Sequence, residues 1–474
     1  MELSKNKLEV INFMDEMAGS RSQWVKKNQY YYDDLAGFLK YNILEKSSIL
    51  EIGCGNGFLL DAIKPGRGVG IDLSGKMIFH AKESYPNLVF YKMDAEDINL
   101  AEDFDYVVMS DALGYMEDIQ KVFRGLKGVV SNNSRIIITY HSFFWLPFLR
   151  LAESLGLKMP QKKLNWLNGN DILNLLELEG FEAVKTGRRF LLPVKISVIS
   201  AFINHYIANL PVVNWFCLTG YIIAKTAYGE KETGLKSVSV VVPARNEEGN
   251  IENIVKRLPL MGNNTEIIFV EGHSRDGTLA EIKRVREKYK TDRDIKYFIQ
   301  DGRGKGDAVR KGFAAATGDI LMILDADMTV PPEDLPKFFE AIATGRGEFI
   351  NGTRLVYPLE DEAMRFLNIG GNKFFSWMFS WLLGQRLKDT LCGTKVISRQ
   401  NYLNLIKNRK FFGEFDPFGD FDLLFGAAKL NLKIVEIPIR YQAREYGETQ
   451  ISRFTHGWLL LKMVFFAMNK IKFL

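Results

Sequence analysis

The sequence predicts an α/β protein built of two consecutive domains. The chain has 474 residues, which is more than a single hydrophobic core usually organises. In each half, short apolar runs typical of strands alternate with helical segments. Between the halves, the stretch KTAYGEKETGLK at residues 225–236 is polar and contains glycine, which is typical of a linker. We therefore expect one domain over residues 1–228 and another over residues 237–474.

Composition narrows the class of protein. The chain is 47% apolar and 25% charged, as in globular proteins. A net charge of +5 is compatible with anionic phosphates or a membrane surface and is too small to indicate nucleic-acid binding. The three cysteines, Cys54, Cys217 and Cys392, lie far apart and form no CxxC pair. We expect neither a disulfide framework nor a zinc site, and a reducing compartment such as the cytoplasm. No partner protein is indicated.

Two segments invite comparison with membrane-associated helices. Residues 196–224 contain no Asp, Glu, Lys or Arg, yet Asn, His and Pro residues interrupt them, so we expect a buried insertion followed by a strand. The tail from Trp458 to Met468 is shorter than a membrane span and contains Lys462. Two alternatives stand for this tail, a helix packed on its own domain and a helix at a membrane interface. Peripheral contact with the cytoplasmic face of a membrane is therefore one alternative.

The first half contains a glycine-rich turn at the end of a predicted strand. After residues 1–47, which suit a lid or packing helices, the strand Ser48–Ile52 leads into EIGCGNGF. The glycines of this turn let a ligand approach the backbone closely. Asp72 ends a second strand about 20 residues further on, where an acid can bind ribose hydroxyls. These features alone fit any nucleotide-binding site built on a glycine-rich turn after a strand, including one for NAD.

Later markers discriminate between nucleotide sites. The glycines read GxGxG with Glu51 before them, Asp94-Ala95 follows a third strand, and Ser110-Asp111-Ala112 follows a fourth. Residues 135–140, 181–186 and 216–224 are expected to complete the sheet. The first half thus resembles the class I S-adenosylmethionine-dependent methyltransferases, which implies a Rossmann-like fold and S-adenosyl-L-methionine as cofactor. The resemblance implies binding by Glu51, Gly53, Gly55, Gly57, Asp72, Asp94 and Ala95.

The methyl acceptor is not predicted. His141, just after the fifth strand, is a candidate base, although such a histidine more often caps or packs. The run Phe143, Phe144 and Trp145 either lines an apolar acceptor pocket or packs in the core.

In the second half, an apolar strand, Ile320–Leu324, ends in Asp325 and Asp327. Alternation along an extended chain would point both carboxylates the same way. Two hard oxygen ligands at such a strand end suit a divalent cation that also grips a diphosphate, and the alternative is an ordinary strand-ending turn. The preceding Gly304, Lys305 and Gly306 offer close backbone approach and a cation, which suits a diphosphate.

The segments VVPARNEE, EGHSRDGT, DADMT, FINGTR, DTLCGTK and REYGETQISR occur in this order. With them the second half resembles family 2 glycosyltransferases of the GT-A (nucleotide-diphospho-sugar transferase) fold, nearest the polyprenyl-phosphate sugar transferases of the dolichol-phosphate mannose synthase type. The resemblance implies a nucleotide-diphosphate sugar as donor and Mg²⁺ or Mn²⁺ at Asp325 and Asp327. It also implies three sets of residues: catalytic Asp325, Asp327 and Asp422, with Asp420 as an alternative to Asp422; donor-binding Pro243, Arg245, Asn246, Glu247, Glu271, Ser274, Asp276 and Lys305; and acceptor-phosphate-binding Arg354, Lys395, Arg444 and Arg453.

Several positions depart from the family pattern. Gly272 and His273 replace an Asp-Gly pair, which leaves the nucleotide preference open. Thr329 stands where the mannose synthases generally carry Gln, which bears on the metal geometry. Gln450 replaces a phosphate-contacting lysine, and Arg453 restores that charge only if the loop turns back.

The sequence thus predicts a bifunctional enzyme, a methyltransferase joined to a metal-dependent, inverting glycosyltransferase. The expected sugar acceptor is a polyprenyl phosphate or another glycoconjugate. Two alternatives stand beside it. In one, the sugar goes to a glycan or small molecule without a lipid phosphate. In the other, one domain is a binding scaffold without catalysis.

Overall fold

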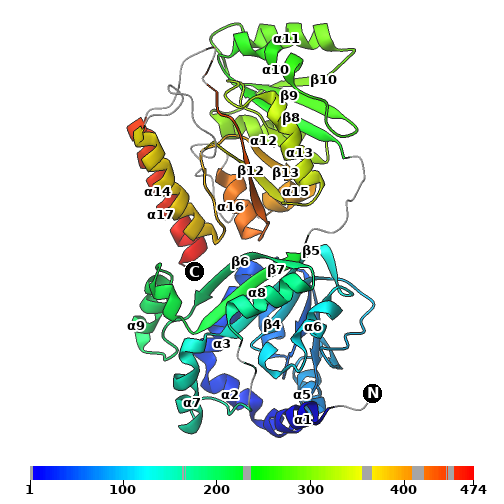
Figure 1. Ribbon diagram of the computed structural model, residues 1–474, viewed down its shortest axis with the longest axis vertical. Coiled ribbons are helices and arrows are strands. Elements are labelled where there is room, and N and C mark those ends of the chain that lie inside the picture. Colours follow the sequence, from blue (N-terminus) through cyan, green and yellow to red (C-terminus); the bar gives the residue numbers. More distant parts are fainter. Residues whose placement is uncertain are drawn as a thin grey trace. The chain divides into compact units, whose positions relative to one another are not determined.

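Two seven-stranded sheets organise the chain in this computed structural model, which describes residues 4–162, 165, 167–227, 236–354, 366–407, 421–442, 444, 446 and 453–473. The chain divides into two compact units, Met1–Ala227 and Tyr228–Lys472. In each unit helices cover both faces of the sheet (Figure 1), as expected for a largely parallel sheet whose strands are apolar on both faces.

The first sheet has the strand order β3-β2-β1-β4-β5-β7-β6. Its strands are β1 (Ser48–Ile52), β2 (Arg67–Asp72), β3 (Val89–Lys92), β4 (Phe104–Ser110), β5 (Val130–His141), β6 (Phe181–Arg189) and β7 (Thr219–Thr226). In this sheet β7 runs antiparallel to β5 and β6, and the other strand pairs are parallel. The Rossmann-like fold that the methyltransferase resemblance implies is confirmed. Because the parallel strands end at one edge, the loops after β1, β2, β3 and β4 meet there.

Alternation along the strands divides the first core into two layers. Leu50 and Ile52 of β1 pack in one cluster with α6 and α8, whereas Ile49 packs in the other with α3, α4 and α5. The helices of this unit are α1 (Lys5–Met17), α2 (Arg21–Lys27), α3 (Gln29–Asn42), α4 (Phe58–Ile63), α5 (Gly75–Ser84), α6 (Ile119–Leu126), α7 (Leu146–Ser154), α8 (Gly169–Leu178) and α9 (Ser197–Phe202).

The segment before β7 differs from the expectation of a buried insertion. It forms α9 and the short turns η4 (Ile203–Ile207) and η5 (Val213–Phe216), and many of its apolar side chains are exposed. Asparagine side chains hold it together: Asn204 Oδ1 accepts hydrogen bonds from the backbone N–H groups of Leu191 and Leu192, both at 2.8 Å. Hydrogen bonds from its asparagines to the preceding chain and to Tyr30 satisfy these polar groups without burial in the core, and β7 begins only at Thr219.

The second sheet has the order β10-β9-β8-β11-β13-β12-β14. Its strands are β8 (Val238–Ala244), β9 (Thr265–Glu271), β10 (Asp294–Ile299), β11 (Ile320–Ile323), β12 (Phe349–Thr353), β13 (Lys395–Ser398) and β14 (Ile434–Pro438). In this sheet β13 runs antiparallel to β11 and β12, and the other pairs are parallel. The carboxyl ends of β8, β9 and β11 therefore meet at one edge. This mixed α/β architecture confirms the fold class predicted for the second half.

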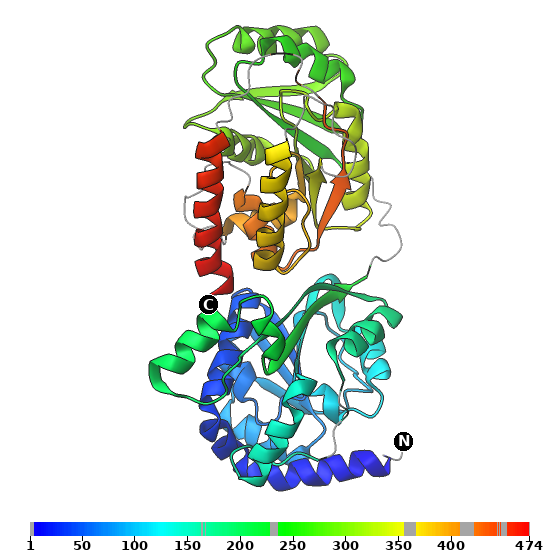
Figure 2. The same cartoon turned by 60° about the vertical axis from the view of Figure 1, so that its left-hand side comes forward.

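The helices of the second unit are α10 (Ile251–Arg257), α11 (Thr278–Tyr289), α12 (Lys305–Ala315), α13 (Leu335–Ala343), α14 (Phe366–Leu383), α15 (Arg399–Lys407), α16 (Phe421–Lys429) and α17 (Arg453–Ala467). Helices α14 and α17 lie side by side in both views (Figures 1 and 2). Helix α17 buries Leu460, Met463 and Val464 and exposes Trp458 and Phe465. Within the described part of the chain, no helix has the length and apolar character needed to cross a bilayer.

Candidate active sites

A cavity of about 360 Å³ lies at the carboxyl edge of the first sheet. It is lined by six of the predicted cofactor residues: Glu51, Gly53, Gly55, Asp72, Asp94 and Ala95. Gly57 is absent from this lining. Gly57 directly precedes α4 and has a φ of +78°, a conformation that favours glycine. A Cβ at this position would lie 2.6 Å from the Phe90 ring, so packing also requires glycine here.

Asp72 ties the glycine turn to the end of β2. Its Oδ2 accepts a hydrogen bond from Gly55 N at 2.9 Å, and its Oδ1 accepts one from Ser74 N at 2.8 Å. Burial raises the pKa of Asp72, and these two backbone donors oppose that shift. Each carboxylate oxygen retains a further lone pair, so Asp72 can also accept hydrogen bonds from ligand hydroxyls.

Glu51 is buried at the floor of this cavity. Its Oε2 has no hydrogen-bond partner among the described residues. Burial raises the pKa of Glu51 to about 8. A ligand that brings a positive charge close to Glu51 would stabilise the ionised carboxylate, and S-adenosylmethionine carries both a sulfonium and an ammonium. The orphaned oxygen and the glycine turn therefore fit this cofactor.

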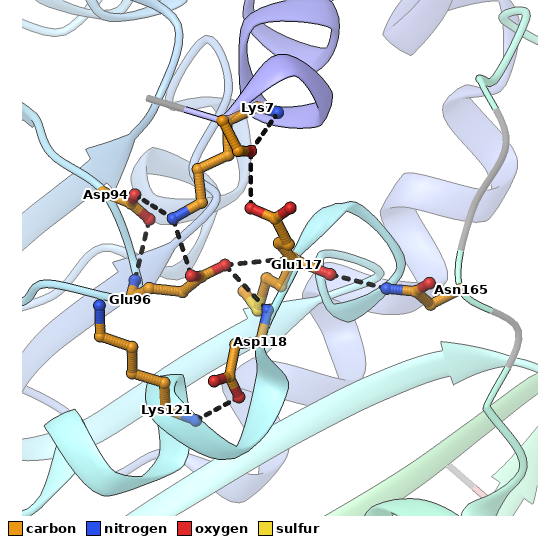
Figure 3. A network of polar contacts seen from close by, with 9 residues as sticks. Lys7, Asp94, Glu96, Glu117, Asp118, Lys121 and Asn165 are labelled. Atoms are coloured by element: carbon orange, nitrogen blue, oxygen red, sulfur yellow. Dashed lines mark hydrogen bonds and ion pairs between the residues drawn. The ribbon is translucent and has the colours of Figure 1, made fainter. Parts of the chain in front are cut away.

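One face of α1 also lines the cavity, through Lys7, Val10, Ile11 and Met14, which have the spacing of a single helical face. Lys7 Nζ pairs with Asp94 Oδ2 at 2.6 Å and with Glu96 Oε2 at 2.7 Å (Figure 3). Asp94, one of the predicted cofactor residues, thus also holds α1. The sequence carried no signal for this contact, because 87 residues separate Lys7 from Asp94.

Glu96 anchors the same network from the other side. Its Oε1 accepts hydrogen bonds from the backbone N–H groups of Glu117 and Asp118 at 2.9 and 3.0 Å (Figure 3). The carboxylate therefore links the loop after β3 with the start of α6, and Lys7 adds α1 to that link.

On the far wall of the cavity, His141 faces Asp111 and Tyr31. The Tyr31 hydroxyl donates a hydrogen bond to Asp111 Oδ2 at 2.5 Å, and His141 Nε2 lies 3.8 Å from the same oxygen. Burial lowers the pKa of His141, so the imidazole is neutral at neutral pH. Asp111 would stabilise the protonated form, which is the arrangement required of a proton acceptor. Trp145 lines the cavity as well, whereas Phe143 and Phe144 are exposed.

In the second unit, the two predicted donor loops are bound to each other at the sheet edge. Asn246 N donates to Ser274 Oγ at 3.0 Å, and Arg275 N donates to Asn246 Oδ1 at 2.8 Å. Glu247 N donates to Thr278 Oγ1 at 2.9 Å, and the Thr278 hydroxyl donates to Asp276 at 2.5 Å. Glu271 is buried and accepts from Ser274 N. Arg245 is exposed, and Pro243 lies within β8, which continues past it to Ala244 rather than ending there.

Asp325 lies in the turn after β11, because the strand ends at Ile323 and not at Leu324 as predicted. Its Oδ1 pairs at 2.6 Å with the ammonium of Lys305, the first residue of α12. The loop that contains Gly393 passes so close that a Cβ at this glycine would lie 1.9 Å from Asp325 Oδ2. Any side chain at position 393 would displace the carboxylate.

Asp327 has different partners. Its Oδ2 accepts from Arg444 Nη2 at 2.8 Å, and its Oδ1 accepts from the Thr329 hydroxyl at 2.8 Å. Arg444 Nη1 also lies 3.4 Å from Glu247 Oε1, which connects this turn to the donor loop after β8. The link from Asp327 through Arg444 to Glu247 was not predicted, since 117 and 197 residues separate Arg444 from its two partners.

The donor chemistry of Asp325 and Asp327 suits Mg²⁺ or Mn²⁺, which prefer carboxylate oxygens and complete their shell with water and phosphate oxygens. No group of three or more Asp, Glu, His or Cys side chains within the described ranges forms a ready-made metal cluster. Two protein carboxylates fit an ion that takes its remaining ligands from a diphosphate. Thr329, at the position where the mannose synthases generally carry Gln, donates its hydroxyl to Asp327.

The residues predicted to bind the acceptor phosphate have different surroundings in the structure. Arg354 forms two parallel hydrogen bonds to the buried Asp389, at 2.7 and 2.8 Å. Lys395 is buried, and its ammonium donates to the Cys392 carbonyl oxygen at 2.6 Å. Asp422 lies in the first turn of α16. The side chain of Arg453, together with Asp420 and Gln450, lies outside the described residues.

Comparison with known proteins gives two family matches. Residues 43–179 match the family described as Methyltransferase domain, and residues 239–400 match Glycosyl transferase family 2. The dolichol-phosphate mannosyltransferase of Pyrococcus furiosus is 37% identical over 221 residues, which are 45% of this chain and 59% of that protein. The undecaprenyl-phosphate 4-deoxy-4-formamido-L-arabinose transferase of Edwardsiella ictaluri is 26% identical over 220 residues, 46% of this chain and 63% of that protein.

Among solved structures, magnesium protoporphyrin IX methyltransferase of Synechocystis PCC 6803 with bound SAH aligns with a TM-score of 0.34 and 16% identity, covering 47% of this chain and 100% of that one. Of the two sugar transferases named above, the match to this chain spans less than two thirds of the length of each. The two family matches fall in the halves in which the corresponding motifs lie.

Proposed function

We infer that this chain, which carries a methyltransferase domain followed by a family 2 glycosyl transferase domain, transfers a methyl group at one site and a sugar at another. The observation that carries the second activity is the convergence of Lys305, Asp325, Asp327 and Arg444 on the edge where the donor loops meet. Opposite charges gathered at the carboxyl ends of parallel strands suit a nucleoside diphosphate and its counter-ion.

In the first domain, Glu51, the glycine turn and Asp72 would bind S-adenosylmethionine. The methyl group would pass from the sulfonium sulfur to a nucleophilic atom of the acceptor, the S–C electron pair staying on sulfur. The proton that the acceptor loses would go to the neutral His141 imidazole, with Asp111 stabilising the charge that forms. Alignment of the two reactants in this cavity would supply most of the rate.

Asp72→Ala tests this assignment directly. The substitution removes the acceptor of both the Gly55 and Ser74 hydrogen bonds, so the turn loses its anchor as well as its ribose partner. We expect binding of S-adenosylhomocysteine, measured by calorimetry, to weaken about a hundredfold. Asp61→Ala, on the exposed side of α4, is the matched control. Equal affinity in wild type and Asp72→Ala would overturn the assignment.

In the second domain, Asp325 and Asp327 would hold the divalent ion, and Lys305 at the start of α12 would face the diphosphate. A bound Mg²⁺ or Mn²⁺ supplies a positive charge that stabilises the departing nucleoside diphosphate. Inversion follows from the family resemblance: the acceptor attacks the anomeric carbon opposite the leaving group. A phosphate acceptor is already ionised at neutral pH and needs no strong base.

We propose a polyprenyl phosphate as the sugar acceptor, in line with the names of the two relatives. Incubation with radiolabelled nucleotide sugars and polyprenyl phosphate should move label into the organic phase. The runner-up, a glycan or small-molecule acceptor, is favoured by Arg354 and Lys395, which both bind groups within the protein. Label that stays in the aqueous phase as a transfer product would support that runner-up.

A further inference from the structure

Exposed apolar side chains of the first unit gather where η3 (Phe143–Trp145), α7 and η5 meet. The Phe144 ring lies 6.0 Å from that of Phe148 and 5.5 Å from that of Phe216. The Trp145 indole N–H donates to the Phe216 carbonyl oxygen at 2.7 Å, across 71 residues of sequence. The two segments thus form one surface, the aromatic patch, whose exposed members include Phe144, Phe148, Leu151, Leu155, Trp215 and Phe216.

The segments that form and flank the aromatic patch carry more cations than carboxylates. Residues 190–218 contain no Asp or Glu, and the only carboxylate in residues 142–162 is Glu153, which pairs with Lys158 at 2.9 Å. Arg150, Arg188 and Lys195 are exposed. The Arg188 guanidinium donates to the Trp215 carbonyl oxygen at 2.6 Å, which places one of these cations beside the patch.

Exposed aromatic side chains beside cations indicate what kind of surface the aromatic patch binds. Exposed Trp and Phe with a rim of Lys and Arg fit the interface of an anionic bilayer, where aromatic rings lie at headgroup level and cations meet lipid phosphates. A second copy of this chain that presented the same patch would bring like charges together, which disfavours such a dimer.

The aromatic patch is continuous with the wall of the cofactor cavity. Trp145, Phe148 and Val194 line the same cavity as Glu51 and Asp72. Helix α7 therefore contributes to both surfaces. An amphiphile that follows α7 from a bilayer would keep its apolar part against Trp145 and Phe148 and bring its polar head toward His141.

We propose that the aromatic patch inserts into the interface of an anionic bilayer and that the methyl acceptor is a membrane amphiphile received along α7. The identity of the acceptor as an amphiphile rests on the proposed methyl transfer, whereas bilayer insertion does not. The patch lies in the methyltransferase unit, apart from the C-terminal tail for which the sequence left interfacial contact open.

Co-sedimentation of the full chain with vesicles tests the insertion. Wild type should bind vesicles of phosphatidylcholine with phosphatidylglycerol more tightly than phosphatidylcholine alone, and high salt should remove that difference. Phe144→Ser combined with Trp215→Ser, 50% and 70% exposed, should weaken binding about tenfold. The matched control, Phe79→Ser with Leu178→Ser, is 58% and 61% exposed on other helices and should bind as wild type.

A local probe separates the aromatic patch from the second unit, which also exposes Trp458 and Phe465. The native cysteines are buried, so Trp215→Cys and, as control, Phe79→Cys can each be labelled with an environment-sensitive dye. The dye at position 215 should shift to the blue on adding anionic vesicles, and the dye at position 79 should not.

Three results would overturn the proposal: vesicle binding unchanged by the double substitution, a label at position 215 that stays in water, or a dimer in light scattering that the double substitution dissociates. Calorimetry with S-adenosylhomocysteine on the same proteins keeps the two proposals apart. If wild-type protein failed to bind S-adenosylhomocysteine, the methyl-transfer assignment would be refuted, while vesicle binding would still test insertion of the aromatic patch.

Discussion

Asp327→Asn should abolish metal-dependent hydrolysis and transfer of the donor sugar, with a loss of about a hundredfold to a thousandfold in rate. The substitution keeps the size of the side chain and removes the charge that would hold the cation. It also weakens the hydrogen bond that Arg444 donates to Asp327 Oδ2 at 2.8 Å in the wild-type protein. Release of nucleoside diphosphate from a nucleotide sugar, measured across a Mn²⁺ titration, checks this expectation.

Asp301→Asn provides the matched control. Asp301 lies in the same stretch, is largely exposed, and pairs only at the surface with Lys311. The Asp301→Asn protein should hydrolyse the donor nucleotide sugar at the wild-type rate. An Asp327→Asn protein that keeps the wild-type rate and the wild-type Mn²⁺ dependence would refute the metal site at this turn. The methyl transfer proposed for the first half would be unaffected by that outcome.

The positions of most strands along the chain and of the ligand loops that follow them were accessible from sequence because they follow local rules. The apolar runs at residues 48–52, 106–109 and 135–140 were long enough to identify strands, and glycine or aspartate marked the carboxyl ends of the first two. Parallel topology then brings Glu51, Asp72 and Asp94 to one edge without any further information. This is why six of the seven predicted cofactor residues line a single cavity.

Contacts between distant segments were not accessible in this way. Lys7 reaches Asp94, and Arg444 reaches both Asp327 and Glu247, across long sequence separations for which no periodicity exists. Exposure was misjudged for the segment before β7, because an uncharged sequence suggests burial whether or not the fold offers a core to receive it. The strand end at Ile323 was also missed, since an apolar residue can extend a strand or begin the following turn.

Arg354→Ala should destabilise the second unit by about 3–5 kcal/mol, because it removes the guanidinium that pairs with a buried carboxylate. The Asp389 side chain is 0% exposed and is held by Arg354 through Nε, Nη2 and the backbone N–H, at 2.7, 2.8 and 3.0 Å. Urea unfolding measures the loss. Arg257→Ala breaks a similar but exposed pair with Glu333 and should cost no more than about 1 kcal/mol.

The pH dependence of this loss follows from the pKa of Asp389. Burial alone would raise that pKa, but the Arg354 guanidinium and the hydrogen bonds it donates lower it overall. A folded-state pKa below the unfolded value of about 4 means that the pair stabilises the fold above that pH. The contribution disappears as the pH falls through the lower folded-state value. The difference between wild type and Arg354→Ala should therefore be greatest near neutrality and shrink in acid.

The same variant decides between two roles for Arg354. The family resemblance implies a phosphate-binding arginine in the acceptor region, whereas the geometry gives a buried ion pair that also stacks over Tyr441 at 5.2 Å. If Arg354 served mainly to bind an acceptor phosphate, its removal would raise the KM for polyprenyl phosphate and leave the unfolding midpoint nearly unchanged. A guanidinium already committed to Asp389 predicts the reverse order of effects. Arg354→Lys should recover only part of the stability, since an ammonium cannot make both parallel hydrogen bonds.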